Sequence, residues 1–157
     1  MQRFTLFTTS YKRFQPGMGE PVQASNGKPR WKLPYDLTYA IREAYPKWSL
    51  VKSNLSEEEF TRRYHADLDK VGVDAISSRL RAIAVATGSE RLVLLCFEEI
   101  SKPDNWCHRR MFASWWEAQT GDAVRELGPT GPLDDQAGLL DYQTSLVVDP
   151  DTGEIRD

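Results

Sequence analysis

The run LVLLCFEE, residues 92–99, decides the fold, and the run WCHRR, residues 106–110, follows it closely. The first run is apolar at successive positions, as expected of a strand that is covered on both faces. The second run opens a helical pattern. Both cysteines of the chain and one of its two histidines lie here, Cys96 in the first run and Cys107 with His108 in the second. We therefore expect a buried strand, a short polar loop and the start of a helix, with reactive side chains gathered at the junction.

The composition is that of one folded domain. With 157 residues, of which 40% are hydrophobic and 27% charged, the chain can bury a core without disulfide or metal support. Its net charge of -3 excludes a general attraction to nucleic acid or anionic membranes but allows a local basic patch. No apolar run is long enough to span a membrane, and the first residues lack a signal-peptide pattern. We expect a cytoplasmic protein without membrane association, whose cysteines are reduced thiols.

Strand and helix patterns alternate along the chain. Strands are expected at residues 3–8, 22–25 and 92–97, and helices at residues 36–45, 56–71, 74–88 and 106–119. This order predicts an α/β fold: a three-layer, Rossmann-like arrangement in which helices flank a mainly parallel sheet. Residues 1–121 would form the core domain. Residues 122–157 would form a C-terminal extension, a hairpin or a tail, that packs on the core or trails from it.

Capping residues mark the ends of three helices. Ser56 and Glu59 have the spacing of a capping box. Asp74 is the expected cap of the next helix, and Gly88 supplies its left-handed end. Gly121 is expected to end the helix that begins at the WCHRR run.

Polar side chains follow all three predicted strands. Since ligands of open α/β sheets bind beyond the carboxyl ends of the strands, we expect these side chains to converge on one pocket. The candidates for ligand binding are Ser10, Tyr11, Ser25, Arg30, Trp31, Cys96 and Arg109, and the candidates for catalysis are Glu98, Cys107 and His108.

LLCFEE followed by CHRRMFASWW resembles the signature of the bacterial and phage domain-of-unknown-function family numbered 488. The upstream blocks SNGKPRW and EEFTRRYHADLD are also similar to blocks of that family, so the resemblance covers roughly Arg3 to Gln119. It implies a functional site without implying a reaction. The positions that it carries over are Ser25, Pro29, Arg30, Trp31, Cys96, Glu98, Cys107, His108 and Arg109.

The helix start at residues 106–110 is suited to an anionic ligand. The first turn of a helix presents free N–H groups and a positive dipole end, and an arginine offers a forked donor to phosphate. Arg109 and Arg30 would bind the anion, and Trp31 could stack on a base. In the alternative, these arginines form ordinary ion pairs with neighbouring carboxylates such as Glu98.

Glu98 and His108 could act on such a ligand. A carboxylate in a partly dry cleft can activate water or stabilise an oxocarbenium-like state, and a histidine can protonate the leaving group. These roles correspond to cleavage of the glycosidic bond of a nucleotide or modified base. In the alternative, Glu98 only orients Arg109 or caps the helix.

Two other chemistries compete for the same residues. Cys107, at a helix N-terminus, could be an activated thiol with Cys96 as its resolving partner, although Cys96 also fits a small buried residue. A metal site is disfavoured, because the neighbouring Cys107 and His108 point about 100° apart on a helix. We expect no cofactor.

The sequence thus favours a pocket for a phosphate-bearing, nucleotide-like small molecule or a nucleic-acid base, with a hydrolase of the N-glycosidase type as the enzymatic hypothesis. The alternative is a non-catalytic accessory module that binds a protein partner. A thiol-dependent enzyme using Cys107 is the third reading.

Overall fold

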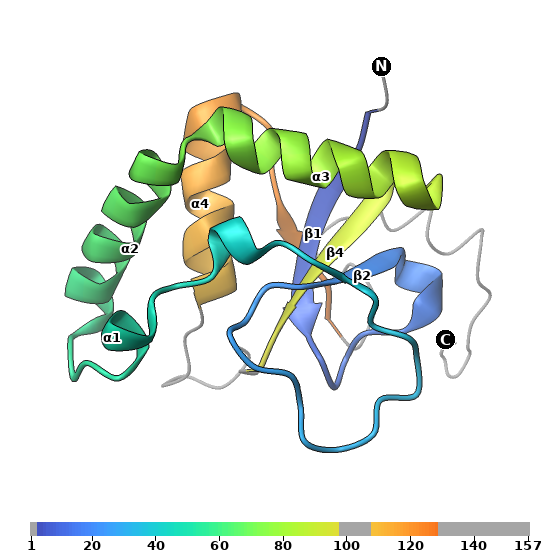
Figure 1. Ribbon diagram of the computed structural model, residues 1–157, viewed down its shortest axis with the longest axis horizontal. Helices are drawn as coiled ribbons and strands as arrows, with labels where there is room; N and C mark the ends of the chain where they lie inside the picture. The colour runs from blue at the N-terminus through green and yellow to red at the C-terminus, as the bar shows by residue number, and fades with distance from the viewer. Residues whose placement is uncertain (1–2, 98–107, 129–157) are drawn as a thin grey trace.

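A five-stranded, all-parallel sheet with helices packed on it forms the centre of the fold (Figure 1). The computed structural model describes residues 3–97 and 108–128. The strand order is β3-β2-β4-β1-β5, and every neighbouring pair is parallel. The predicted Rossmann-like α/β fold is therefore confirmed.

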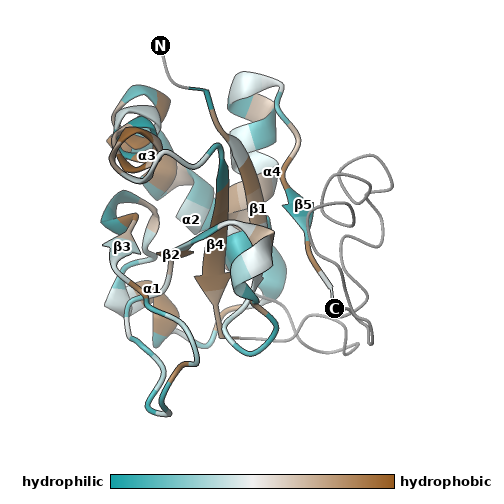
Figure 2. Cartoon of the chain, turned by 90° about the vertical axis from the view of Figure 1, so that its right-hand side faces the viewer, coloured by the Kyte–Doolittle hydropathy of each residue, from teal (hydrophilic) through white to brown (hydrophobic). Residues whose placement is uncertain are grey.

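The strands are β1 (Thr5–Ser10), β2 (Glu20–Gln23), β3 (Tyr39–Ala40), β4 (Arg91–Cys96) and β5 (Arg125–Glu126). The α-helices are α1 (Trp48–Val51), α2 (Glu57–Val71), α3 (Val73–Thr87) and α4 (His108–Thr120). Two short 3-10 helices are η1 (Pro16–Met18) and η2 (Arg42–Ala44). The central strand β4 is buried from its second residue onward, and Figure 2 shows most of it in the colour of hydrophobic residues.

Helices α2, α3 and α4 pack on one face of the sheet. Their apolar sides meet Leu6, Val22, Leu92 and Leu94, the side chains that the strands present to this face. The helices contribute Phe60, Tyr64, Leu68, Ile76, Leu80, Ile83, Ala84, Met111, Phe112, Trp115 and Trp116. The apolar sides of the three helices are thus buried against the sheet, whereas Val71 at the end of α2 is 41% exposed.

The other face of the sheet is covered by loops and by η1 among the described residues. β1 and β2 are parallel, but only residues 11–19 connect them, which is too short for the usual crossover helix. Phe14 and Met18 from this connection pack on Val93 and Leu95 instead. Gly19 leads into β2 at a φ of 143°, and a Cβ there would lie 2.7 Å from the carbonyl oxygen of Arg91. Only glycine fits this close approach to β4.

Two local predictions are wrong. Residues 36–45 are not a helix: Tyr39–Ala40 pairs with β2 as strand β3, and η2 follows. The long-range pairing with β2 overrides the local helical pattern. Asp74 does not cap α3, because that helix begins one residue earlier, after Gly72.

The other helix-end predictions are confirmed. Ser56 Oγ accepts a hydrogen bond from the backbone N–H of Glu59 at 3.1 Å, which is the N-cap half of a capping box, while the Glu59 carboxylate accepts from Arg62 and Arg63. Gly88 has the left-handed conformation with a φ of 73°, and Gly121 follows α4 with a φ of 83°.

The described part of the C-terminal extension packs on the core. β5 pairs with β1, and Leu127 is fully buried. The hairpin or tail expected further along the chain lies outside the described residues. None of the described helices is long and apolar enough to cross a membrane.

Candidate functional site

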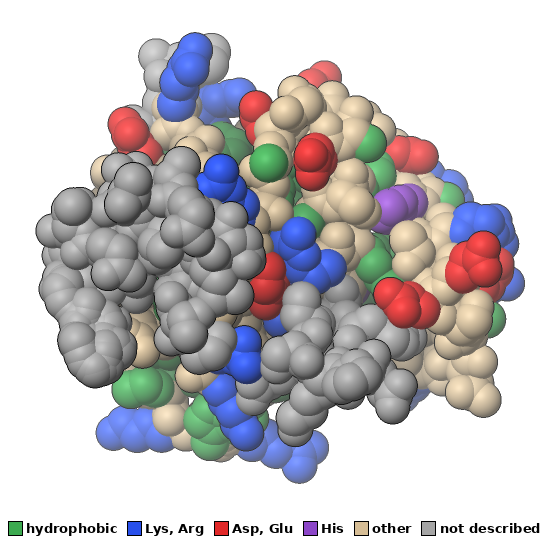
Figure 3. Space-filling model, turned by 180° about the vertical axis from the view of Figure 1, so that it is seen from behind, with side chains coloured by type: hydrophobic (Ala, Val, Ile, Leu, Met, Phe, Trp, Pro, Cys, Tyr) green, Lys and Arg blue, Asp and Glu red, His purple; other side chains and the backbone are tan. Residues whose placement is uncertain are grey.

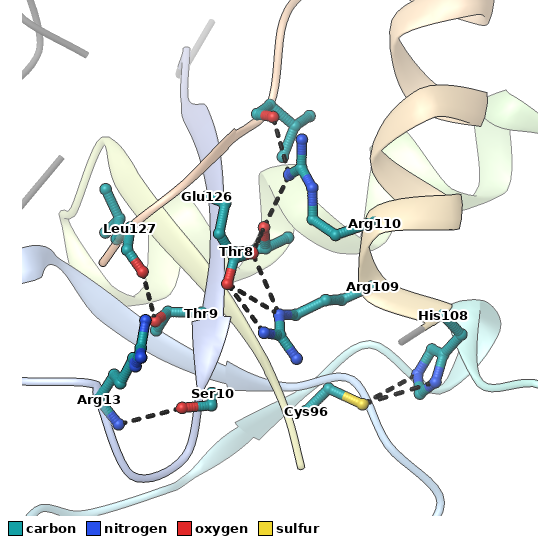
Figure 4. A network of polar contacts seen from close by, with 11 residues as sticks. Thr8, Thr9, Ser10, Arg13, Cys96, His108, Arg109, Arg110, Glu126 and Leu127 are labelled. Carbon is teal, nitrogen blue, oxygen red and sulfur yellow. Dashed lines mark hydrogen bonds and ion pairs between the residues drawn. The ribbon is translucent and has the colours of Figure 1, made fainter. Parts of the chain in front are cut away.

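Three strand ends meet the start of α4. Ser10 at the end of β1 is the register partner of Cys96 at the end of β4, and both are buried. His108, the first residue of α4, contacts Cys96 and also the backbone just after β2 (Figure 4). The ends of β1 and β4 and the backbone after β2 therefore lie together beside the start of α4.

Arg109 forms the centre of this site. It is only 1% exposed, and its Nε and Nη2 donate to the carboxylate of Glu126 at 3.1 and 2.8 Å. Its third nitrogen, Nη1, is buried and has no hydrogen-bond partner among the residues that the structure describes. Figure 4 shows this nitrogen directed away from Glu126, toward the side on which Ser10 and Cys96 are drawn. A buried guanidinium thus has one unused donor at the carboxyl ends of β1 and β4.

Thr8 and Arg110 extend the network around Glu126. The hydroxyl of Thr8 donates to Glu126 at 2.6 Å and accepts from Nη1 of Arg110 at 2.8 Å. The same Arg110 nitrogen donates to the carbonyl oxygen of Val124 at 3.0 Å. Side chains of β1, α4 and β5 are therefore joined by charge-assisted hydrogen bonds.

The sequence did not point to Glu126. Glu126 falls in the stretch assigned to the extension, and Arg109 was expected to pair, if at all, with carboxylates nearer in the chain. Residues 124–127 read VREL, a pattern without apolar-polar alternation, so local periodicity predicted no strand there.

His108 holds α4 against the strand ends. Its Nε2–H donates to the carbonyl oxygen of Ala24 at 2.7 Å, and its Nδ1 lies 3.5 Å from the Cys96 sulfur. The ring of Tyr64 meets it edge-on at 5.8 Å. Burial, with a smaller contribution from the charge of Arg109, lowers the pKa of His108 to about 4. The imidazole is therefore neutral at pH 7 and its proton is engaged by Ala24, which favours a positioning role over proton donation.

The cysteine predictions have a mixed outcome. Cys96 is buried, as its place at the end of an apolar strand indicates, but its sulfur is in a disulfide bond. The prediction of a reduced thiol at Cys96 is therefore wrong. Glu98 and Cys107, two of the three catalytic candidates, lie outside the described residues.

Tyr11 and Ser25 fix the loop after β2. The Tyr11 hydroxyl lies 2.7 Å from the Ser25 hydroxyl, which donates in turn to the carbonyl oxygen of Gly27 at 2.7 Å. Both side chains are buried, and burial raises the pKa of Tyr11. Both side chains bond to other groups of the protein, so their role is to hold the loop that carries Arg30 and Trp31.

Arg30 and Trp31 do not join the Arg109 network. Both are exposed, and Arg30 makes no ion pair with any described residue. The ring of Trp31 lies near Phe97, with 6.4 Å between centroids. The candidates thus divide between two sides of the sheet: Ser10, Cys96, His108 and Arg109 on the helix side, and Tyr11 with Trp31 on the other.

Described residues line pockets at both ends of the strands. One, of about 470 Å³, opens at the carboxyl ends of β2 and β3 and is lined by Gln23, Asn26, Lys28, Thr38, Arg42 and Tyr45, among others. A larger one, of about 700 Å³, lies at the opposite ends of the strands, beside Arg3, Arg81 and Trp116. Among the described residues, no three His, Cys, Asp or Glu side chains are placed to hold a metal ion.

Comparisons of the chain with protein-family models, with curated proteins and with solved structures find no match. The resemblance to the family numbered 488 therefore stays a prediction, and the functional argument rests on the geometry of this chain.

Proposed function

We propose that the protein binds a phosphate-bearing, nucleotide-like ligand at the N-terminus of α4. One observation carries the proposal: Nη1 of Arg109 is buried, has no partner in the described part of the chain, and faces the ends of β1 and β4. Leaving a buried charged donor unpaired is unfavourable, by about 1–3 kcal/mol or more. An oxyanion placed there would satisfy it.

The local charge favours an anion. Arg109 and Arg110 carry two positive charges and Glu126 carries one negative charge, while His108 is neutral. The first turn of α4 adds backbone N–H groups that have no partner within the helix, together with the positive end of the helix dipole. The site therefore combines a net positive charge with several donors.

The place in the fold supports a nucleotide over a bare anion. In open parallel sheets, ligands bind at the carboxyl ends of the strands, and phosphates bind at helix N-termini there. The hydroxyl of Ser10 accepts one hydrogen bond, from the backbone of Arg13 at 3.2 Å, and keeps its own hydrogen for a ligand.

Cleavage of the glycosidic bond of this ligand stays a prediction. It depends on Glu98 as base or charge stabiliser, and Glu98 lies outside the described residues. We assign to His108 the task of holding α4 in register with the strand ends, because its hydrogen is engaged by Ala24.

Binding of inorganic phosphate and of a nucleoside monophosphate, measured by isothermal titration calorimetry, tests the proposal. Arg109→Lys keeps a positive charge beside Glu126 but lacks the forked third donor, so binding should weaken about tenfold, the equivalent of ~1.4 kcal/mol. Arg79→Lys is the matched control, because Arg79 makes a similar contact with Glu43, at 3.1 Å, on the surface.

Two results would overturn the proposal. One is the absence of heat from either ligand with the unmodified protein. The other is equal affinity in the Arg109→Lys and Arg79→Lys variants. Either result would favour the accessory-module reading, in which the Arg109–Glu126 pair only joins α4 to β5.

A further inference from the structure

The loop after β2 carries alternating cations and an indole. Its sequence at residues 28–32 is KPRWK, and Lys28, Arg30, Trp31 and Lys32 are all exposed. Residues 26–35 contain these three cations and no acidic residue. On a chain whose net charge is -3, this loop is a local positive surface.

Aromatic rings from three strand ends meet on this loop. Tyr11 follows β1, Phe97 follows β4, and Trp31 lies in the loop after β2. The Tyr11 and Phe97 centroids are 5.0 Å apart, and Trp31 meets Phe97 at 6.4 Å with nearly perpendicular planes. Tyr11 is buried, whereas Trp31 is 44% exposed and Phe97 is 37% exposed. Two differently oriented rings therefore reach the surface together.

The cations around these rings have no anionic partner in residues 3–97 and 108–128. The ammonium of Lys12 lies 5.7 Å from the centre of the Trp31 ring, within the range of a cation–π contact. Lys12, Lys28, Arg30 and Lys32 form no ion pair with any described residue. In Figure 3, basic and hydrophobic side chains lie together along the lower edge of the molecule. We call Lys12, Lys28, Arg30, Trp31, Lys32 and Phe97 the aromatic-basic patch.

We propose that the aromatic-basic patch binds single-stranded nucleic acid. Exposed rings stack on unpaired bases, and neighbouring cations bind the phosphates between them, which is the usual combination in proteins that bind single strands. A duplex hides its base faces, so it could use only the cations. Two partly exposed rings give too little apolar area for stable insertion into a bilayer.

The pocket at the ends of β2 and β3 continues the patch, since Lys28 belongs to both. The side-chain amide nitrogens of Gln23 and Asn26 donate to the carbonyl oxygens of Ser25 and Pro46. Their amide oxygens accept no hydrogen bond from a described residue. With about 470 Å³, the pocket has room for a base beside these two acceptors. This binding surface goes beyond the proposed function, because none of its residues belongs to the Arg109 network.

Fluorescence anisotropy of a labelled oligothymidylate of about 12 nucleotides, a length in the range that single-strand binding sites cover, tests the proposal. Trp31→Ala should weaken binding about tenfold. Trp48→Ala is the matched control: Trp48 is 57% exposed, and Lys52 lies over its ring at 5.7 Å, as Lys12 does over Trp31. Its affinity should stay within twofold of the unmodified protein.

Salt dependence tests the cations separately. Each phosphate contact adds about 0.7 to the slope of log affinity against log salt concentration for single strands. Arg30→Gln with Lys32→Gln should therefore lower that slope by about 1.4, if both contact phosphates. Lys52→Gln with Lys70→Gln removes the same charge elsewhere and should leave the slope unchanged.

Three outcomes would overturn the proposal. The first is no oligonucleotide binding at low salt. The second is an equal loss of binding in Trp31→Ala and Trp48→Ala. The third is binding to phosphatidylserine vesicles, with loss in Trp31→Ala, but not to the oligonucleotide.

The Arg109→Lys variant separates the two proposals, because oligonucleotide binding that survives in it supports the patch. If Arg109→Lys loses oligonucleotide binding and Trp31→Ala keeps it, the oligonucleotide binds at the N-terminus of α4 and not at the patch.

Discussion

The two sides of the sheet differ sharply at the carboxyl ends of β1 and β4. Consecutive residues of a strand point to opposite faces, so Ser10 and Cys96 lie on the side of α4, and Tyr11 and Phe97 lie on the other. The first side is a buried charged network and the second is an exposed aromatic-basic patch. Changes on the first side should therefore alter folding and binding together, whereas changes to the exposed residues of the second side should alter binding alone.

The largest expected effect is on the buried ion pair. Arg109→Met removes the guanidinium that Glu126 faces at 2.8 Å and leaves that carboxylate largely buried without its charge partner. Breaking such a pair typically destabilises a protein by about 3 kcal/mol or more. Urea unfolding followed by circular dichroism would measure the loss.

A second substitution serves as the control for this loss. Adding Glu126→Leu removes the stranded carboxylate, so the Arg109→Met/Glu126→Leu protein should recover most of the lost stability. The double variant could instead be less stable than Arg109→Met. Replacing the stranded carboxylate by leucine would then bring no gain, and an unpaired charge on Glu126 could not be the cause of the instability of Arg109→Met.

The lowered pKa of His108, which lies on the same side of the sheet, predicts that the stability of the protein depends on pH. Its folded pKa is about 4, below the ordinary value of about 6.5, so the unfolded chain takes up a proton that the folded protein does not. Stability from this group is complete above about pH 6.5 and is lost as the pH falls toward 4, by about 3 kcal/mol. Unfolding free energies measured between pH 4 and 7.5 would show the slope.

The His108→Gln variant should lack this part of the pH dependence, because glutamine does not titrate. An unchanged slope in that variant would mean that carboxylates, and not His108, produce the acid sensitivity. At pH 7 the variant also reports how strongly the contact with Ala24 holds α4 in place.

Much of the fold could be predicted from local patterns. β4 was evident from its continuous apolar run, and α4 from the spacing of Met111, Phe112, Trp115 and Trp116, because these patterns follow directly from burial. The capping box at Ser56 was equally clear. The elements that were missed, β3 and β5, have two residues each and exist only by pairing with another strand. A pattern of two residues carries no periodicity that could reveal them.

The candidate site was predicted only in part for a related reason. Arg109 and His108 stood out by residue type, and both lie at the strand ends. The partner of Arg109 could not be found, since Glu126 reaches it through β5. The expected single pocket also assumed that all strand exits point the same way. The alternation of side chains sends Tyr11 and Ser10 to opposite faces, which separates Trp31 from Arg109.

A smaller effect is expected on the second side, beneath the patch. Tyr11→Phe removes the hydroxyl that lies 2.7 Å from Ser25, which should cost about 1 kcal/mol of stability. Ser25→Ala removes the same contact and also the hydrogen bond to Gly27. A double-mutant cycle of the two should give a coupling energy of about 1 kcal/mol. A coupling near zero would show that the loop is held by packing and not by this hydrogen bond.

The smallest effect on stability is expected at the surface of the patch itself. Trp31 is 44% exposed, and the contacts that it makes with Phe97 and Lys12 are both at the surface, so Trp31→Ala should change the unfolding free energy by only about 0.5 kcal/mol. Trp48→Ala, at the other exposed indole with a lysine over its ring, should behave alike in urea. The two variants should therefore differ in oligonucleotide affinity while agreeing in stability. If Trp31→Ala instead lowered the unfolding free energy by several kcal/mol, the indole would hold the strand ends together. Folding and binding would then not be separable on the side of the patch.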